Sequence, residues 1–356
     1  MDKFRIDGHK MAYHTARVSD WLGGSMVYPI YVEISPSGLC NHRCVFCAYD
    51  FIGYPNRRLD TERLLPFIGE MARCGVKSVL YAGEGEPLLH KDISKIVTHT
   101  RTSGIDVGMF TNGQLLKREI SEAMLSDLTF LRFSFNGGTD ESYAQVHGVA
   151  SGVFNKVIAN IAAAVDLKRK NALAVDIGAQ YVLLPENKDS AVEAVKILRD
   201  IGVDYVAIKP FVHQSPMQSY QMKGQLIMEE ITDILAVAEA LSNERFNAIA
   251  RRSAFDKPNT GRGYNHCYGT SFISVVNSAG QVSSCLPYWD KEEFLFGNIY
   301  ENTFEEIWFG PKRKSVLNYL ENTIDTHACP SNCRPHNVNE FLWEIRHPTI
   351  KHINFI

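Results

Sequence analysis

The distribution of apolar residues divides the chain into short buried strands separated by amphipathic helices. Runs typical of buried strands occur at 27–34, 76–82, 105–111, 130–136, 175–184 and 205–209. Helical spacing of apolar residues occurs at 61–74, 92–101, 118–125, 153–170, 190–200 and 225–241. Asp60 is a suitable N-cap for the first of these helices, and Gly75 is a suitable terminator. Strands alternating with helices predict parallel βα units with right-handed crossovers, and so an α/β fold.

The two ends of the chain do not follow this alternation. Residues 1–26 show no strong periodicity and are expected to be a lead-in. A polar, glycine-containing passage at 251–265 precedes two short apolar runs that flank turn residues at 277–280, which is the pattern of a hairpin. We therefore expect a βα domain over 27–240 and a small α+β domain over 241–356.

Composition excludes several classes of protein. The 356 residues suffice for a full-sized core and a smaller appended domain, and 45% hydrophobic with 22% charged residues is ordinary for a globular protein. A net charge of −3 without a long basic block argues against a nucleic-acid partner. The N-terminus lacks the apolar region of a signal peptide, and no apolar run approaches membrane-spanning length, so we expect a cytoplasmic protein without a membrane partner. Its eight cysteines then indicate metal binding rather than disulfides.

Three of these cysteines lie on one loop directly after the first expected strand. Cys40, Cys44 and Cys47 are separated by three and then two residues. Three thiolates suit a soft metal, and an iron–sulfur cube normally takes four, so this trio leaves one iron open to another ligand. A structural zinc site is the alternative, but zinc sites usually come as paired C-x2-C knuckles, which this spacing does not match.

With Phe46 between the last two cysteines, the loop resembles the C-x3-C-x-aromatic-C motif of the radical SAM superfamily. The resemblance implies a partial (β/α)6 barrel and a [4Fe–4S] cluster whose open iron binds S-adenosyl-L-methionine. It also implies that an electron from this cluster cleaves the sulfonium to a 5′-deoxyadenosyl radical.

Several residues at strand ends are candidates for binding S-adenosylmethionine. The sequence Gly83-Glu84-Gly85-Glu86 follows the second expected strand, and its glycines permit a tight turn and close approach of a ligand. It resembles the GGE motif of the superfamily, which holds the methionyl ammonium, although Glu84 stands where many members have glycine. The resemblance further implies contacts from polar residues on later strands, for which ordinary turn or structural roles remain open: Asn112, Ser134, Asn136 and Gln180.

A second cysteine set occupies the last third of the chain. The expected hairpin brings Cys267 and Cys285 together, and Cys329 and Cys333 follow on a later loop. Spacing alone leaves zinc and iron–sulfur open. Together with Gly297-Asn298-Ile299 and the segment 304–308, the set resembles the SPASM/twitch domain and the spacing of the cyclitol (2-deoxy-scyllo-inosamine) dehydrogenases. This implies one auxiliary [4Fe–4S] cluster.

An auxiliary cluster favours an oxidation. We expect the adenosyl radical to take hydrogen from an alcohol carbon of a sugar or cyclitol, with or without a nucleotide, and the auxiliary cluster to accept an electron as the ketone forms. Radical epimerisation is the alternative, but only Cys74 remains as a thiol donor. Peptide maturation is another, disfavoured because no peptide-recognition domain fits ahead of Cys40. A zinc-stapled binding protein leaves the Cys40–Cys47 spacing unexplained.

Residues expected to touch the substrate lie beyond the sixth strand. Lys209 and His213 are expected to anchor a hydroxyl or phosphate, or to accept the alcohol proton. Arg262, with Arg251 and Arg252, is a candidate to close over an anionic group, and Tyr288 to line the space between the clusters. Ordinary roles remain open for these residues: a solvated surface for the charged ones and for His213, and packing for Tyr288. The expected partners are a small-molecule substrate and a reductant such as flavodoxin or ferredoxin.

Overall fold

Ten strands form one sheet in the computed structural model, which describes Phe4 and residues 9–212, 226–256, 261–288, 291–330 and 333–355. The strand order is β10-β9-β8-β1-β2-β3-β4-β5-β6-β7. Every neighbouring pair from β8 through β1 to β7 is parallel, whereas the β8–β9 and β9–β10 pairs are antiparallel. The strands are β1 Tyr31–Ile34, β2 Ser78–Tyr81, β3 Asp106–Thr111, β4 Phe130–Ser134, β5 Asp176–Leu183, β6 Tyr205–Pro210, β7 Asn247–Ala250, β8 Ile273–Val276, β9 Gln281–Ser283 and β10 Leu295–Asn298.

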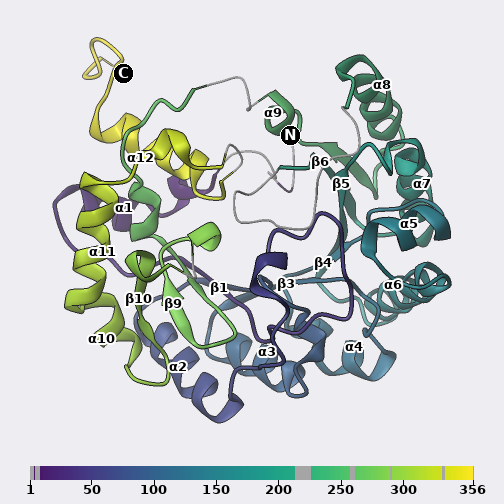
Figure 1. The fold of residues 1–356 in the computed structure, drawn as a ribbon, viewed down its shortest axis with the longest axis horizontal. Coiled ribbons are helices and arrows are strands. Elements are labelled where there is room, and N and C mark those ends of the chain that lie inside the picture. Colours follow the sequence, from purple (N-terminus) through teal and green to yellow (C-terminus); the bar gives the residue numbers. More distant parts are fainter. Residues whose placement is uncertain are drawn as a thin grey trace.

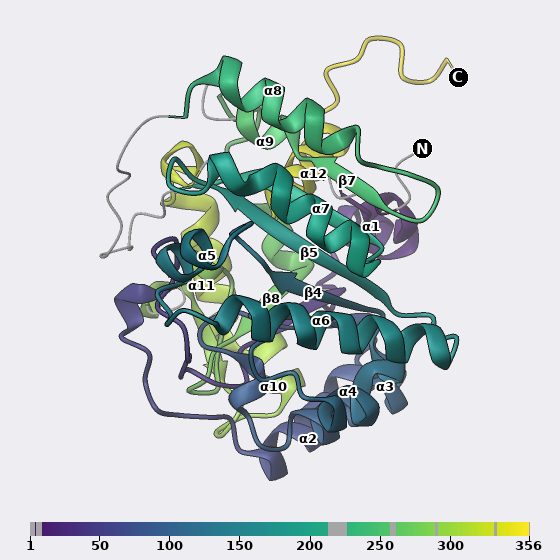
Figure 2. The same ribbon diagram turned by 90° about the vertical axis from the view of Figure 1, so that its right-hand side faces the viewer.

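The helices cover the outside of this curved sheet. Those that connect the first strands form an outer arc, and the C-terminal helices lie across from the arc, beside α1 (Figures 1 and 2). Their bounds are α1 Thr15–Leu22, α2 Thr61–Arg73, α3 Ile93–Thr102, α4 Arg118–Met124, α5 Asp140–His147, α6 Val153–Lys170, α7 Ala191–Ile201, α8 Met228–Glu239, α9 Arg252–Asp256, α10 Phe304–Phe309, α11 Pro311–Asn322 and α12 His336–Arg346.

The six expected strands and the helices between them are confirmed. The Asp60 side chain caps α2 by accepting a hydrogen bond from the Glu62 N–H at 3.0 Å, and the expected hairpin forms between β8 and β9. These strands are buried on the side that faces the helices and therefore carry many apolar residues. Their positions can be predicted from the apolar runs in the sequence.

Other elements were not expected. The lead-in contains α1, whose Trp21 packs in a small apolar cluster with Phe272 and Leu342. The helix α5 is only eight residues long and begins with a capping box in which Thr139 and Ser142 bond to each other's backbone N–H. The four-residue strand β7 is too short for a clear period, and it extends the sheet beyond β6.

The β8–β9 hairpin joins the same sheet instead of standing apart from it. Strand β8 pairs in parallel with β1, the strand that precedes the Cys40–Cys47 loop. The hairpin that Cys267 and Cys285 flank is therefore part of the same sheet. In this register the hairpin tip lies beside the carboxyl end of β1, and Cys267 and Cys285 flank the other end of the hairpin, beside the amino end of β1.

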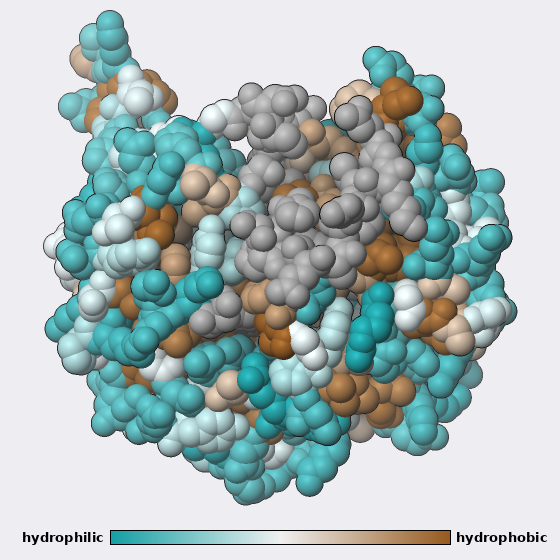
Figure 3. Space-filling view, viewed as in Figure 1, coloured by the Kyte–Doolittle hydropathy of each residue, from teal (hydrophilic) through white to brown (hydrophobic). Residues whose placement is uncertain are grey.

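The two faces of the strands have different surroundings. In β1, Val32 and Ile34 are 1% and 0% exposed and pack under the helices, whereas Tyr31 and Glu33 face inward and line a cavity. On the face seen in Figure 1, hydrophilic side chains dominate the coloured surface and hydrophobic ones form small separate groups (Figure 3). No helix in the described part of the chain is long and apolar enough to cross a membrane.

Candidate active site

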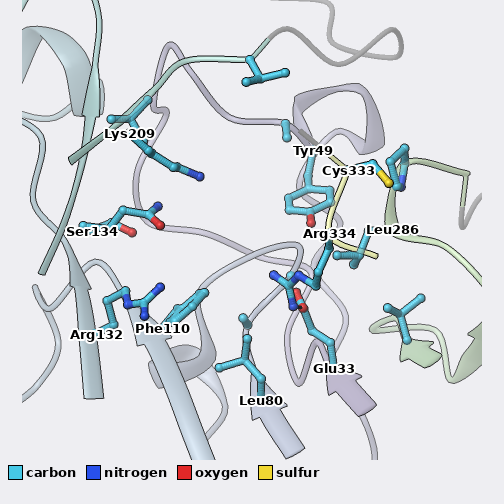
Figure 4. A pocket seen from close by; sticks show the side chains of 18 of the residues that line it. Glu33, Tyr49, Leu80, Phe110, Arg132, Ser134, Lys209, Leu286, Cys333 and Arg334 are labelled. Atoms are coloured by element: carbon cyan, nitrogen blue, oxygen red, sulfur yellow. Dashed lines mark hydrogen bonds and ion pairs between the residues drawn. The ribbon is translucent and has the colours of Figure 1, made fainter. Parts of the chain in front are cut away.

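A cavity of about 770 Å³ lies inside the curved sheet and extends to the carboxyl ends of its strands. Inward residues of β1 to β6 and β8 line it, together with the Cys40–Cys47 loop and the loops that carry Cys285 and Cys333. Lys209, Ser134 and Arg132 reach into it from one wall, and Tyr49 and Arg334 from the other (Figure 4). Carboxyl ends of parallel strands are where βα folds place their active sites.

The Cys40–Cys47 loop is held in place by backbone contacts on both sides. On one side, the Glu86 N–H donates to the Leu39 carbonyl at 2.9 Å. Gly85 makes this approach possible, because it has a φ of 70° and a Cβ there would lie 2.1 Å from the Ser37 carbonyl oxygen.

On the other side, the loop pairs with the end of α5. The Arg43 and Val45 N–H groups donate to the carbonyls of His147 and Val146, each at 3.0 Å. Gly148 follows with a φ of 60°, and a Cβ there would lie 2.1 Å from the Arg43 carbonyl oxygen. The two glycines thus allow the cysteine loop to be clamped between the β2 turn and α5.

The three thiols of this loop suit a cluster better than a single ion. Cys40, Cys44 and Cys47 all line the cavity. A zinc ion would hold thiolates about 3.8 Å apart. Within the described residues, however, the only three ligand atoms that lie within 4.8 Å of one another come from His42, Cys44 and His147. The thiols are therefore spread more widely than one zinc ion requires.

Burial also shows what a bound group must supply. Desolvation raises the pKa of Cys40 to about 12, with Glu86 and Cys47 adding to the shift. Thiols in this environment stay protonated without a cation, so binding of a positively charged metal centre must drive their ionisation.

The two histidines beside Cys44 belong to a directed hydrogen-bond chain. The Asn136 N–H donates to His147 Nε2 at 3.2 Å, which leaves the proton of a neutral His147 on Nδ1. This Nδ1 lies 3.4 Å from both Cys44 Sγ and His42 Nδ1. His42 Nε2 in turn lies 2.8 Å from Gln114 Oε1, an acceptor, so His42 Nδ1 is unprotonated in the neutral ring. The His147 Nδ1–H therefore faces two acceptors behind the loop, the Cys44 sulfur and His42 Nδ1.

Most residues predicted to contact S-adenosylmethionine surround the cavity, and that role remains a prediction. The lining residues are Phe46, Gly83, Gly85, Glu86, Asn112, Ser134 and Gln180. The carboxylate of Glu86 accepts hydrogen bonds from the Thr111 hydroxyl at 2.6 Å and from the Asn112 N–H at 2.8 Å, which fixes the β2 and β3 ends together.

Glu84 and Asn136, predicted in the same role, do not line the cavity. The Glu84 carboxylate accepts from the Ser278 N–H at 2.7 Å and lies 3.5 Å from Arg57, so it ties the hairpin turn to the barrel. Asn136 is buried, and its side-chain oxygen accepts from the Val182 N–H at 2.5 Å. The geometry gives both side chains structural contacts instead.

The four C-terminal cysteines come together next to the cavity. Burial raises the pKa of Cys285 well above its ordinary value, and the nearby thiols Cys333, Cys267 and Cys329 raise it further. Asn339 Nδ2 donates to Cys267 Sγ at 3.4 Å. No three of these thiols form a single-ion set within 4.8 Å among the described residues, so their spacing also fits a cluster.

Arg262 and Tyr288 stand beside this second set and not in the cavity lining. Arg262 donates to the Cys329 and Pro330 carbonyls at 3.0 and 2.6 Å, and its Nη1 lies 3.8 Å from Cys333 Sγ. Tyr288 stacks on Phe294 with ring centroids 4.7 Å apart. The predicted catalytic roles of both residues thus find no support in the geometry.

The other predicted catalytic residues differ in outcome. Lys209 lines the cavity, and burial lowers its pKa to about 8, with the positive charges of Arg251 and Arg132 adding to the effect. His213 lies outside the described residues.

The sequence analysis did not identify several charged residues of the cavity, among them Glu33, Arg132 and Arg334. Glu33 and Arg132 lie on β1 and β4, and Arg334 directly follows Cys333. Arg334 Nη1 contacts the Glu33 carboxylate and the Tyr31 hydroxyl, so the loop of the second cysteine set is anchored to the cavity wall. Glu33 and Arg132 could have been predicted because each is a charged residue in a strand that is otherwise apolar. Such a residue must face a cavity or a partner.

The fold is an open parallel barrel with three cysteines after its first strand and four more around an appended hairpin, as the resemblance to radical SAM and SPASM domains implies. The comparisons with known proteins agree. Residues 34–198 match the radical SAM superfamily, and residues 267–335 match the SPASM iron–sulfur cluster-binding domain. The chain thus carries a radical SAM domain followed by a SPASM domain, and these indicate [4Fe–4S] clusters and S-adenosylmethionine as cofactors.

The chain is also similar to proteins whose names differ in activity. The chain is 25% identical to the probable GTP 3′,8-cyclase of Saccharolobus solfataricus over 63% of its own length and 68% of that protein. The crystal structure of Streptococcus suis SuiB bound to S-adenosylmethionine aligns with a TM-score of 0.65 and 15% identity, over 87% of this chain and 74% of that one. BtrN in complex with AdoMet and 2-DOIA aligns at 14% identity, over 83% of this chain and 89% of that one, with a TM-score of 0.45, too low to support an argument. The likeness to SuiB shows the fold alone.

Proposed function

We propose that this radical SAM enzyme oxidises an alcohol carbon of a small sugar or cyclitol to a ketone. The observation that carries the proposal is that Cys40, Cys44 and Cys47 line the same cavity as Cys285 and Cys333. A substrate in this cavity has a radical-generating site on one side and an electron acceptor on the other.

The bound groups would supply the redox chemistry: a 5′-deoxyadenosyl radical would take one hydrogen atom from the alcohol carbon and become 5′-deoxyadenosine, the auxiliary cluster would accept one electron, and the hydroxyl proton would pass to water. The residues of the chain provide the frame for it. The turn at Gly85 and the end of α5 hold the first cysteine loop, and the contact between Arg334 and Glu33 fixes the second against the barrel. Such fixed placement is what radical transfer over a short distance requires.

The position of Cys74 favours oxidation over epimerisation. A radical epimerase needs a thiol that returns a hydrogen atom to the substrate. Cys74 is the only cysteine outside the two sets, and it does not line the cavity; it caps the end of α2 beside Tyr28. No described thiol is thus left for that step.

Peptide maturation remains the second candidate. It is supported by the similarity in fold to SuiB, a structure of which contains a precursor peptide. A small substrate is the better match to a cavity whose walls converge on a few inward polar side chains. We propose a cytoplasmic setting with a reductant of the flavodoxin or ferredoxin type, consistent with eight cysteines that are all free.

The test is product analysis with the reconstituted enzyme, S-adenosylmethionine and a panel of sugar and cyclitol alcohols. We expect a ketone and 5′-deoxyadenosine in equal amounts, with deuterium transferred from the oxidised carbon. A Cys285→Ala variant is expected to cleave S-adenosylmethionine without oxidised product, and a Cys74→Ala control to behave as wild type. Unchanged product from Cys285→Ala, or loss of product from Cys74→Ala, would refute the proposed oxidation.

A further inference from the structure

Lys209 and Arg132 form a cationic pair on the cavity wall opposite the Arg334 loop. Lys209 lies near the carboxyl end of β6, and Arg132 lies deeper on β4. Both side chains reach into the shared space shown in Figure 4. Neither makes an ion pair with a described residue, although both are largely shielded from solvent.

Arg132 is held rigidly in its position. Its Nε donates to the Tyr205 hydroxyl at 3.0 Å, and its guanidinium lies 4.7 Å from the ring centre of Phe110 and 5.7 Å from that of Phe130. Aromatic faces stabilise a guanidinium while leaving its terminal N–H groups available. The side chain is thus preorganised to donate into the cavity.

Among the described residues, no carboxylate of the cavity lining is available to pair with these cations. Its described lining includes two acidic residues, Glu33 and Glu86. Glu33 is paired with Arg334, and Glu86 accepts hydrogen bonds from the Thr111 hydroxyl and two backbone N–H groups. Two cations that repel each other in a partly dry site need an anion from outside the protein.

We infer that Lys209 and Arg132 bind a phosphate or diphosphate group carried by the substrate. A phosphate dianion matches two cations from different strands, and arginine and lysine are the side chains that bind such groups. The inference rests on the proposed function, since it names the group of the sugar or cyclitol substrate that the protein binds. The phosphate or diphosphate would then lie against β4 and β6, across the cavity from Arg334 and the auxiliary cysteines.

The test measures binding of inorganic pyrophosphate to the reconstituted protein saturated with S-adenosylmethionine, by isothermal titration calorimetry. We expect Lys209→Met and Arg132→Met each to weaken binding at least tenfold. Lys209→Arg, which keeps the charge, should stay within about threefold of wild type. Lys196→Met, at an exposed ion pair with Glu193 on the outer helix α7, is the matched control and should bind as wild type.

Other outcomes would overturn the inference. It fails if wild type does not bind pyrophosphate, or if malonate binds more tightly with the same dependence on Lys209, since the site would then be one for carboxylates. It also fails if both methionine variants lose affinity for S-adenosylmethionine by the same factor as for pyrophosphate, because the pair would then hold the methionine carboxylate.

Turnover is separate from this measurement. Pyrophosphate binding that depends on Lys209 and Arg132 supports the site even if no alcohol in the panel is oxidised, a result that would count against the proposed oxidation alone. If Lys209→Arg binds pyrophosphate normally but has lost turnover, Lys209 has an additional role as a base; the anion site itself is supported.

Discussion

Replacing Arg334 with methionine is expected to destabilise the protein by about 3 to 4 kcal/mol at pH 7.5 and by less than about 2 kcal/mol at pH 5.5. Arg334 contacts the Glu33 carboxylate, whose side chain is 2% exposed, and the Tyr31 hydroxyl donates to the same carboxylate at 3.0 Å. The variant keeps the Tyr31 hydrogen bond but leaves a buried carboxylate without its cation. Breaking a buried pair in this way costs about 3 to 5 kcal/mol.

Protonation of Glu33 limits the destabilisation, because the variant can neutralise the buried carboxylate by binding a proton. The cost of binding that proton depends on pH. A glutamate with an ordinary pKa of about 4.3 can be neutralised at a cost of about 4 kcal/mol at pH 7.5, but of only about 1.6 kcal/mol at pH 5.5. In the unfolded variant the carboxyl ionises freely, so the deficit in unfolding free energy grows as the pH rises.

The assay is thermal unfolding of the anaerobically reconstituted protein, followed by circular dichroism at both pH values. At about 2 °C per kcal/mol for a chain of this size, the melting temperature should fall by about 6 to 8 °C at pH 7.5 and by about half as much or less at pH 5.5. Adding Glu33→Gln should restore at least half of the loss. Arg118→Met, at an exposed pair with Glu122, is the control and should cost under about 1 kcal/mol.

Two results would refute this reasoning. One is a melting temperature of the Arg334→Met variant that falls equally at both pH values. The other is a double variant with Glu33→Gln that is no more stable than the single one. Either result would mean that the contact contributes packing and not charge neutralisation.

Three further predictions concern the cofactor sites and the anion site. Gly85→Ala forces a side chain onto a backbone with φ 70°, at a cost of about 1–2 kcal/mol before any clash, and should lower iron retention in the first cluster, measured by iron analysis; unchanged iron would contradict the loop clamp. His147→Phe removes a donor to a cluster cysteine and should shift the reduction potential of the first cluster to lower values in an EPR-monitored titration, with His147→Gln closer to wild type; equal potentials would remove the hydrogen bond from the account. Because burial, Arg251 and Arg132 lower the pKa of Lys209 to about 8, pyrophosphate affinity should fall as the pH rises from 7 to about 9.5, and this fall should be smaller in Lys209→Arg; equal profiles would argue against charge loss at this lysine.

The fold could be predicted where buried strands and helices give apolar residues a regular spacing along the sequence. Strands β1 to β6 are apolar on the face that packs under the helices, and α6 spans the 18 residues expected of it. The strand β7 and the helix α5 are short, and a window of four to eight residues carries little periodic signal. The parallel pairing of β8 with β1 joins residues more than 240 positions apart, which local pattern does not encode.

The candidate site was predictable where chemistry is carried by unusual residues at a fixed spacing. Both cysteine sets met this condition. Glu84 and Asn136 were misplaced because the sequence shows that a polar residue ends a strand, but not whether its side chain enters the cavity or bonds to a neighbouring loop. Glu33 and Arg132 could have been found, since alternation places them on the inward face of strands whose other face is buried.

The central claim is that two iron–sulfur clusters face one cavity, and the most direct test is the iron and sulfide content per chain after anaerobic reconstitution. Wild type is expected to hold about eight irons, and a variant with Cys40, Cys44 and Cys47 all changed to alanine about four, without forming 5′-deoxyadenosine. About four irons in wild type, falling to none in the variant while zinc remains, would contradict the claim. The C-terminal site would then be structural, and redox-neutral radical chemistry would replace the oxidation.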